Sequence, residues 1–448
     1  MDDIAKPVVG NELNLEPYWL PYTANRAFKN APRIIESAQG FYYKTRDGQT
    51  ILDSFSGLWS TGLGHCHPRI VKAVQDQVAK LDYAAAFQVG HTGAFELAEK
   101  VIDFAPDGFD HVFFTNSGSE SVDTALKIAL GWHRVRGEGT RIKLIGRERG
   151  YHGVNFGGMS VGGIPGNRKM FGNAMLPNVD HLPHVLNLEH NAFSKGQPAW
   201  GRHLADELER IVALHDAQNI AAVIVEPVSG SAGVLVPPLG YLERLREICT
   251  RHGILLIFDE VITAFHRIGM PFGCQRFGVM PDIITTAKGI TNGVIPMGAV
   301  LVSREIYQSF MNGPDYAIEF FHGYTYSGHP VAAAAGLAAL DIYVEEDIGA
   351  RVKELEPVFE TALHSLRDAP NVIDIRNFGL MGAIELAPRP GAPGARGMEA
   401  HVKCFEQGLM VRHGMDTLAF SPFLTFTPDL LEQTFDTVRK VINTIRNS

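Results

Sequence analysis

Three short motifs in this sequence carry groups that could do chemistry, and the first would suit a phosphate. Thr115-Asn-Ser-Gly-Ser-Glu120 follows an apolar run and opens a segment with helical periodicity. A glycine there lets the backbone approach a ligand closely, and the free N–H groups at a helix start attract a phosphate dianion. The same residues also suit ordinary helix capping, with Ser117 or Ser119 as the cap. Taken alone, capping is the simpler interpretation.

The second motif places two carboxylates directly after a buried strand. Asp259 and Glu260 follow the apolar run 254–258, which puts them at the sheet edge where α/β proteins bind ligands. A carboxylate there would pair with a protonated ring nitrogen, an arginine or a metal, or Asp259 would simply cap the next helix. A metal needs further ligands, and only His266 lies nearby in the chain. We therefore expect no metal site.

The third motif is a lysine among small residues. Lys288 lies in Thr285-Thr-Ala-Lys-Gly289, at the end of a strand-like segment. Desolvation lowers the pKa of a lysine and makes its amine nucleophilic, as Schiff-base chemistry requires. A lysine whose stem lies on apolar surface while its ammonium stays in water fits these residues equally well.

One class of ligand would use all three motifs together. If they follow strands of one sheet, a phosphate cup, a carboxylate and an amine nucleophile meet at one edge. A phosphorylated pyridine aldehyde needs that set. Its phosphate is anchored, its aldehyde forms an imine with the lysine, and its ring nitrogen stays protonated to accept electrons. The combination is therefore more specific than any single motif.

The elements that must position these motifs alternate between strands and helices. Several apolar runs are continuous, as strands buried on both faces require. We expect strands at 111–115, 142–145, 222–225, 254–258, 282–285 and 299–302. Helical periodicity lies between several of them, as in 239–251, where Leu242, Leu245 and Ile248 follow at three-residue steps. This alternation predicts a large α/β domain at 71–335, with a mostly parallel central sheet flanked by helices.

Both ends of the chain differ from this middle. Residues 1–70 hold a helix candidate and an alternating segment, 40–45, before the hairpin signal Asp47-Gly48. Residues 336–448 hold three helices together with two strand-like segments and a proline- and glycine-rich loop, at 371–376, 380–386 and 387–395. We expect these two stretches to form a smaller α+β domain built from both termini.

Composition and charge exclude several classes of protein. Of the 448 residues, 45% are hydrophobic and 20% charged, which excludes a largely disordered chain. The net charge is −9 and no dense basic cluster occurs, so we expect neither a nucleic-acid nor a membrane partner. Four scattered cysteines suit a reducing compartment. Residues 1–6 do not resemble a signal peptide, and no apolar run is long enough to cross a bilayer. We expect a cytoplasmic protein.

The sequence resembles class III (fold-type I) pyridoxal-phosphate-dependent aminotransferases over nearly its whole length. The matching stretches occur in order: Thr115-Asn-Ser-Gly-Ser-Glu120, Gly150-Tyr-His-Gly153, Glu226-Pro-Val228, Asp259-Glu-Val261, Thr286-Ala-Lys-Gly289 and Thr325-Tyr-Ser-Gly-His-Pro330. Ser56-Gly-Leu-Trp59 and Met410-Val-Arg-His413 are similar to the ω-amino acid–pyruvate branch, which includes β-alanine–pyruvate transaminases. The resemblance implies pyridoxal 5′-phosphate as cofactor and transfer of an amino group from an ω-amino acid or primary amine to pyruvate.

The resemblance also implies cofactor contacts, residue by residue. Lys288 would form the Schiff base and move the proton, and Asp259 would pair with the ring nitrogen. Tyr151 would stack on one ring face and Val261 would press on the other. The further contacts that it implies are Ser117, Gly118 and Ser119 at the phosphate, Thr325 from a partner subunit, His152, and Glu226 near the substrate side, where it could pair with an arginine.

For the substrate, the resemblance implies a pocket walled by Trp59, Phe87 and Tyr151 in a homodimer or tetramer whose active sites lie at the subunit interface. We expect Arg412 to form a bidentate pair with the carboxylate of pyruvate. Without the resemblance, Trp59, Phe87 and Val261 would be interpreted as core residues and Arg412 as a surface residue.

One stretch departs from the family pattern. Where the family has Gly-Arg-Thr-Gly, this chain has His266-Arg267-Ile268-Gly269. The distance of these residues from Asp259 along the chain predicts altered loop packing rather than a lost cofactor contact.

A decarboxylase or aminomutase that uses the same cofactor on the same scaffold is the alternative function. These reactions differ from transamination in which Cα bond is aligned for cleavage, and pyruvate-dependent alanine formation distinguishes them. A non-enzymatic binding protein is disfavoured, because Lys288, Asp259 and the phosphate motif are all present.

Overall fold

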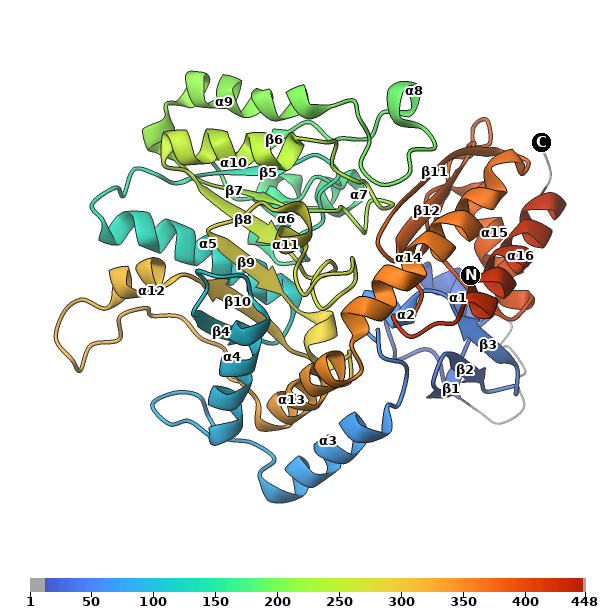
Figure 1. Cartoon of the computed structure of the whole chain (residues 1–448), viewed down its shortest axis with the longest axis horizontal. Helices are drawn as coiled ribbons and strands as arrows, with labels where there is room; N and C mark the ends of the chain where they lie inside the picture. The colour runs from blue at the N-terminus through green and yellow to red at the C-terminus, as the bar shows by residue number, and fades with distance from the viewer. Residues whose placement is uncertain (1–12, 446–448) are drawn as a thin grey trace, which may run out of the picture.

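The centre of the molecule is a seven-stranded sheet with helices packed on both faces (Figure 1). In the computed structural model, which describes residues 13–445, the strand order is β4-β10-β9-β8-β7-β5-β6. Neighbouring strands from β9 to β6 are parallel, and β10 runs antiparallel to both β4 and β9. The strands are β4 (His111–Thr115), β5 (Lys143–Arg147), β6 (Val179–Leu182), β7 (Ile220–Val225), β8 (Leu255–Asp259), β9 (Ile283–Thr286) and β10 (Gly298–Val302). The predicted mostly parallel α/β sheet is confirmed.

The longer helices cover this sheet or belong to the ends of the chain. They are α3 (Pro68–Lys80), α4 (Thr92–Phe104), α5 (Gly118–Val135), α9 (Glu207–His215), α10 (Tyr241–His252), α13 (Pro330–Glu345), α14 (Ile348–His364), α15 (Ala395–Glu406) and α16 (Pro428–Thr444). The short ones are α1 (Asn25–Asn30), α2 (Ser56–Trp59), α6 (Phe156–Val161), α7 (Pro165–Lys169), α8 (Leu188–Asn191), α11 (Gly273–Phe277) and α12 (Arg304–Phe310). No helix among the described residues combines the length and the apolar character that crossing a membrane requires.

Alternate residues of the central strands belong to two separate cores. Val223 and Leu256 share one buried cluster with α10, whereas Ile224 and Ile257 share the other with α5. Strands such as β7 therefore need apolar residues on both faces, which explains why their runs in the sequence are continuous. All six predicted strands are found within two residues of their expected limits.

One strand of the central sheet was not predicted. β6 lies at the edge of the sheet, beside β5 only, and its sequence Val-Asp-His-Leu has two polar residues out of four. An edge strand buries less apolar surface than a central one, so its hydrophobic pattern is weak.

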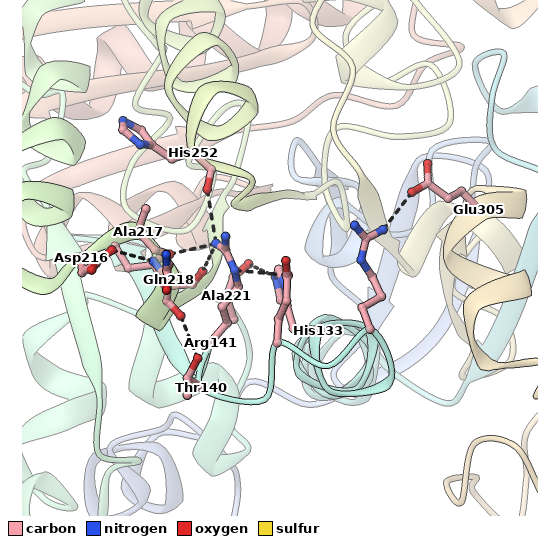
Figure 2. Close-up of polar contacts among 12 residues, drawn as sticks. His133, Thr140, Arg141, Asp216, Ala217, Gln218, Ala221, His252 and Glu305 are labelled. Carbon is pink, nitrogen blue, oxygen red and sulfur yellow. Dashed lines mark hydrogen bonds and ion pairs between the residues drawn. The ribbon is translucent and has the colours of Figure 1, made fainter.

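Figure 2 shows how the chain that follows α5 is tied to the sheet. Arg141 Nη1 donates hydrogen bonds to the carbonyls of Ala217 (2.8 Å) and His252 (3.3 Å), just before β7 and at the end of α10. His133, near the end of α5, places its Nε2 2.9 Å from the carbonyl of Ala221 in β7. These contacts anchor the far end of α5 to the sheet whose strand ends carry Asp259 and Lys288.

The ends of the chain form two four-stranded sheets. The first contains β1 (Ile35–Gln39), β2 (Tyr42–Thr45), β3 (Thr50–Asp53) and β13 (Leu409–Met410), and the second β11 (Val372–Phe378), β12 (Met381–Leu386), β15 (Thr417–Phe420) and β14 (Arg412–Gly414). β3 and β13 pair in parallel, with Leu52 opposite Leu409, so the two ends of the chain share one sheet. The predicted hairpin at Asp47-Gly48 connects β2 and β3, and the strands expected at 371–376 and 380–386 are β11 and β12.

The division of the chain into 1–70, 71–335 and 336–448 stays a prediction. Residues 1–12 of its first segment lie outside the described residues, and the boundary after residue 335 falls inside α13.

Candidate active site

The start of α5 combines a helix cap with free backbone donors. The Ser117 hydroxyl accepts the N–H of Glu120 (3.2 Å), and the Glu120 carboxylate accepts the N–H of Asn116 (2.7 Å). The N–H groups of Gly118 and Ser119 find no acceptor within the described part of the chain. Such donors at the positive end of a helix suit an anion. The capping and phosphate interpretations are therefore compatible, because the cap uses other groups than the anion would.

Gly118 is required here by close packing. A Cβ at this position would lie 2.9 Å from Val261 Cγ2, a distance that real Cβ contacts essentially never show. The missing side chain thus brings Val261, two residues beyond Asp259, directly against the start of α5. The phosphate motif and the Asp259-Glu-Val261 motif meet at this point, as predicted for one sheet edge.

Asp259 ends β8 and is buried, with one oxygen paired to a histidine. His152 Nδ1 lies 2.8 Å from Asp259 Oδ2, and the N–H of Val261 donates to Oδ1 (3.2 Å). His152 is buried too, and its Nε2 has no partner among the described residues. A hydrogen bond from His152 orients the carboxylate and leaves lone pairs for a cationic partner.

Lys288 follows β9 in an unusual backbone conformation. Its φ of +50° lies in the left-handed region, which a lysine adopts only where its surroundings hold it. Burial is the main cause that lowers the pKa of its amine. The resulting pKa of about 8 already includes the effects of Asp259 and Glu226, which raise it, and of Arg412, which lowers it. A substantial fraction of the amine is therefore neutral near physiological pH, as a nucleophile requires.

Glu226 and Tyr151 are joined at the end of β7. Glu226 Oε1 accepts the N–H of Tyr151 (2.9 Å), and burial raises the pKa of the Glu226 carboxyl. Arg147, buried at the end of β5, donates from Nη2 to the Glu226 carbonyl (2.8 Å) and to Ser229 Oγ (2.7 Å). Arg147 is not among the predicted site residues, although an arginine that ends an apolar run is a detectable signal.

Trp59 and Arg412 lie against each other beside Lys288. The Trp59 ring is 4.7 Å from Arg412 Cζ and 5.3 Å from Lys288 Nζ, and only 3% of Trp59 is exposed. Burial lowers the pKa of the Arg412 guanidinium, while Tyr151 and Glu226 raise it. Arg412 forms no ion pair with an acidic side chain in residues 13–445. It is a half-buried cation on an aromatic face, not a solvated surface residue.

Two predicted site residues lie together elsewhere. Phe87 is 57% exposed, with its ring 3.0 Å from where a Cβ of Gly323 would be. Thr325 is exposed, and its carbonyl accepts the Tyr83 hydroxyl (3.0 Å). Neither has a hydrogen bond or ring contact to Lys288 or Trp59 in the part of the chain that the structure describes.

The stretch that departs from the family pattern, residues 266–269, contacts the segment just before Trp59. His266 has a φ of +66°, its ring packs near those of Phe104 and Tyr343, and burial lowers its pKa to about 4. Arg267 donates to the Pro422 carbonyl (2.6 Å) and to Ser56 Oγ (3.0 Å). The arginine that this stretch shares with the family therefore contacts the turn before Trp59, and the altered loop packing stays a prediction.

Solved structures of the same architecture define the class of protein. An amine transaminase from an uncultivated Pseudomonas species, solved in its pyridoxal-phosphate-bound form, matches with a TM-score of 0.88 and 35% identity over 96% of this chain and 99% of that one. A thermostable six-fold mutant of an omega transaminase from Pseudomonas jessenii matches with a TM-score of 0.86 and 34% identity over 95% of each chain. The fold is that of a fold-type I pyridoxal-phosphate transferase.

The sequence comparisons identify the family. The sequence model described as aminotransferase class-III matches residues 23–442, and the chain belongs to this family. It is 57% identical to an omega-aminotransferase of Caulobacter vibrioides, over 96% of this chain and 98% of that one. It is 54% identical to a beta-alanine–pyruvate aminotransferase of Pseudomonas aeruginosa, over 98% of each chain. The predicted family, the aminotransferase activity and the pyridoxal-phosphate cofactor are thereby confirmed.

The residues present fit this cofactor. The free N–H groups at the start of α5 suit its phosphate. Gly118 has no side chain, so Val261 packs directly against the start of this helix. Asp259 suits the protonated ring nitrogen, and the lowered pKa of Lys288 suits covalent attachment of an aldehyde.

Proposed function

We propose that this protein is an ω-transaminase that moves an amino group from an ω-amino acid or a primary amine to pyruvate, giving alanine and an aldehyde or ketone. Arg412 is the observation that carries the proposal. Its guanidinium lies over Trp59 beside Lys288 and lacks an acidic partner in the described residues. The carboxylate of pyruvate would supply the missing negative charge next to the reacting carbon.

We assign the cofactor contacts to groups at the strand ends. Pyridoxal phosphate, when bound, supplies an aldehyde for attachment of an amine and a ring that accepts electrons. Lys288 would hold the aldehyde and, when its Nζ is free, would take or return a proton there. Asp259 would pair with the ring nitrogen, and the N–H groups at the start of α5 would hold the phosphate. The residues assigned beside them are Ser117, Gly118, Ser119, Tyr151, His152, Glu226 and Val261.

Lys288 is suited to proton transfer by its surroundings. Its pKa of about 8 means that Nζ can both accept and release a proton near neutral pH. Trp59 covers the amine and excludes water from one side. Asp259 and Arg412, of opposite charge, act on the same nitrogen. The surroundings thus set the basicity of the group that we assign to the proton.

Arg412 would serve two unlike substrates. It pairs with the carboxylate of pyruvate or alanine, and it moves aside for an amine donor that has none. A guanidinium left buried and unpaired is costly, so it must have another position for carboxylate-free donors. The stacking on Trp59, a contact without directional hydrogen bonds, permits such a movement.

We further propose a homodimer in which Phe87 and Thr325 complete the partner's site. Exposed aromatic side chains surround these two residues, namely Tyr83, Phe321 and Tyr326, which are 39%, 89% and 57% exposed. Tyr83 links them, since its ring lies 5.9 Å from that of Tyr326 and its hydroxyl donates to Thr325. Grouped exposed apolar side chains are typical of protein interfaces, and a second copy of this chain would cover them.

A donor panel tests the reaction. The holoenzyme is incubated with pyruvate and β-alanine, other ω-amino acids or simple aromatic amines, and alanine is measured. We expect alanine in proportion to donor consumed, and none without pyruvate. Donor consumption with carbon dioxide release or isomerisation, and without alanine, would instead establish the decarboxylase or aminomutase.

Mixed subunits test the shared site. Lys288→Ala and Thr325→Val chains are each expected to be impaired. When they are co-expressed, one site of each mixed dimer has an intact Lys288 and receives an intact Thr325 from the partner, so activity should return. Activity that stays at the level of the separate variants would show that Thr325 does not act across an interface.

A further inference from the structure

A carboxylate outside the cofactor contacts is buried at the end of β3. Asp53 is fully buried, and its Oδ1 accepts the N–H of Phe55 (2.8 Å). Its Oδ2 accepts the N–H of Gly57 (2.6 Å) and lies 3.0 Å from His65 Nε2. Burial of a carboxylate is costly unless hydrogen bonds and charge compensate it. Two backbone N–H groups and the contact with His65 offset this cost, so the carboxylate is held at a defined place in the fold.

The two backbone groups that Asp53 holds belong to a strained turn that leads to Trp59. Ser56 and Trp59 have φ values of +41° and +57°, and Gly57 between them has +71°. Side-chain-bearing residues occupy this region at a cost, and they stay there only where the surroundings hold them. The N–H groups of Phe55 and Gly57 lie on either side of Ser56, so Asp53 fastens both ends of the strained step.

The end of β3 also pairs with β13, the strand that leads to Arg412. Asp53 is the register partner of Met410 in β13. The next residue, Ser54, donates from its N–H (3.2 Å) and its hydroxyl (2.7 Å) to the Met410 carbonyl, two residues before Arg412. One short segment therefore positions both the ring and the guanidinium, which meet at 4.7 Å.

His65 is held so that it can support this carboxylate. Its ring lies 4.3 Å from that of Tyr43 and 5.3 Å from that of Phe423, and its backbone pairs with Gly40. These contacts fix the ring on Asp53 Oδ2, the oxygen that also accepts the Gly57 N–H.

We infer that Asp53 and His65 are positioning residues that hold Trp59 and Arg412 at the spacing which recognises a substrate carboxylate. They touch neither cofactor nor substrate, and they act through the turn 55–59 and the pairing of β3 with β13. The inference deepens the proposed function and rests on it, because the carboxylate is that of pyruvate or alanine.

Binding of propionate, an unreactive carboxylate, to the holoenzyme tests the inference by calorimetry. In Asp53→Asn, an amide group faces the Gly57 N–H and His65, and the turn loses an acceptor. We expect propionate affinity to fall about tenfold, the scale of one buried donor left unpaired. In the Arg412→Ala background, the same substitution should have no further effect, since the contact that it positions is gone.

Kinetics separate positioning from general damage. In Asp53→Asn we expect KM for pyruvate and alanine to rise, with kcat and the half-reaction of a carboxylate-free amine little changed. His65→Phe, which keeps a ring between Tyr43 and Phe423, is the second variant in case Asp53→Asn folds poorly. It should likewise raise KM for pyruvate and alanine with little change in kcat. The matched control is Asp374→Asn, a buried carboxylate that accepts from Phe193 and Arg376 instead. Asp374→Asn should not raise KM for pyruvate and alanine selectively.

The outcomes distinguish the inference from the proposed function. Equal losses of propionate affinity in the parent and Arg412→Ala backgrounds, or equal kinetic losses for acid and amine, would overturn the inference. Failure of the parent holoenzyme to form alanine from pyruvate would overturn the proposed function, whereas coupling of Asp53 to Arg412 in propionate binding would still stand.

Discussion

The two sides of the proposed active site are built in different ways. On the cofactor side, Asp259, Lys288 and the start of α5 follow strands of one sheet, and the Asp259 carboxylate is fixed by hydrogen bonds of 2.8 and 3.2 Å. On the substrate side, Trp59 and Arg412 come from opposite ends of the chain and meet through a ring contact.

Because of this difference, one scaffold can hold the cofactor contacts rigidly and still let the substrate contact of Arg412 adjust. Strand register and directional hydrogen bonds hold the cofactor side within narrow limits. A cation on an aromatic face tolerates sliding, because the attraction is less directional. We therefore expect substitutions on the cofactor side to affect all substrates alike, and those on the substrate side to discriminate among them.

The largest effect is expected for Lys288→Ala. The variant should lose covalent attachment of the cofactor, and turnover should fall by at least roughly 10³-fold for every donor, because the proton acceptor is lost. Borohydride reduction followed by peptide mass analysis should find the cofactor on residue 288 of the parent only. Lys127→Ala, on the exposed side of α5, is the control and should behave as the parent. Ordinary turnover in Lys288→Ala would contradict the assignment.

Asp259→Asn should affect all substrates almost as strongly. The amide keeps the shape beside His152 but removes the charge that stabilises a protonated ring nitrogen. Cofactor should still attach, while the half-reactions of acid and amine donors slow together, by roughly 10²–10³-fold, as for loss of one preorganised electrostatic contact. Stopped-flow absorbance measures both. Rates near those of the parent would contradict the pairing of Asp259 with the ring nitrogen.

Arg412→Ala should weaken substrates that have a carboxylate and leave carboxylate-free amines little affected. A desolvated charge pair is worth about 2 kcal/mol or more, so the apparent affinity for pyruvate and alanine should fall by about 30-fold or more. A simple aromatic amine should be little affected, measured as a separate half-reaction. If both substrates lose equally, or neither does, another residue holds the carboxylate, and the contrast between the two sides fails.

The smallest effect links the two sides through the pKa of Lys288. The neutral fraction of a group with a pKa of about 8 rises as pH passes through 8, and cofactor attachment to the apoprotein should follow it. Arg412→Ala removes a positive neighbour and should move this midpoint up. Asp259→Asn removes a negative neighbour and should move it down. Absorbance-monitored reconstitution at a series of pH values measures the midpoint. If both variants shift the midpoint in the same direction, Asp259 and Arg412 do not act on Lys288 as opposite charges.

Local patterns were sufficient for the cofactor side. Six strands, and the motifs containing Gly118, Asp259 and Lys288 that follow three of them, were predictable because apolar periodicity marks a strand and the group that ends it together. Those motifs need only a shared sheet edge to converge. The edge strand β6 escaped prediction because few of its residues are apolar.

Sequence alone thus determined the α/β sheet, the family and the order of the cofactor motifs. Tertiary structure alone decided that Trp59 meets Arg412, that Phe87 and Thr325 lie on an exposed face, and that Asp53 is buried with His65. The physical reason is that the contacts of Trp59 and of Asp53 depend on the register of β3 against β13 and on a turn with left-handed residues. Pairing between segments so distant in the chain leaves no periodic signal in either one.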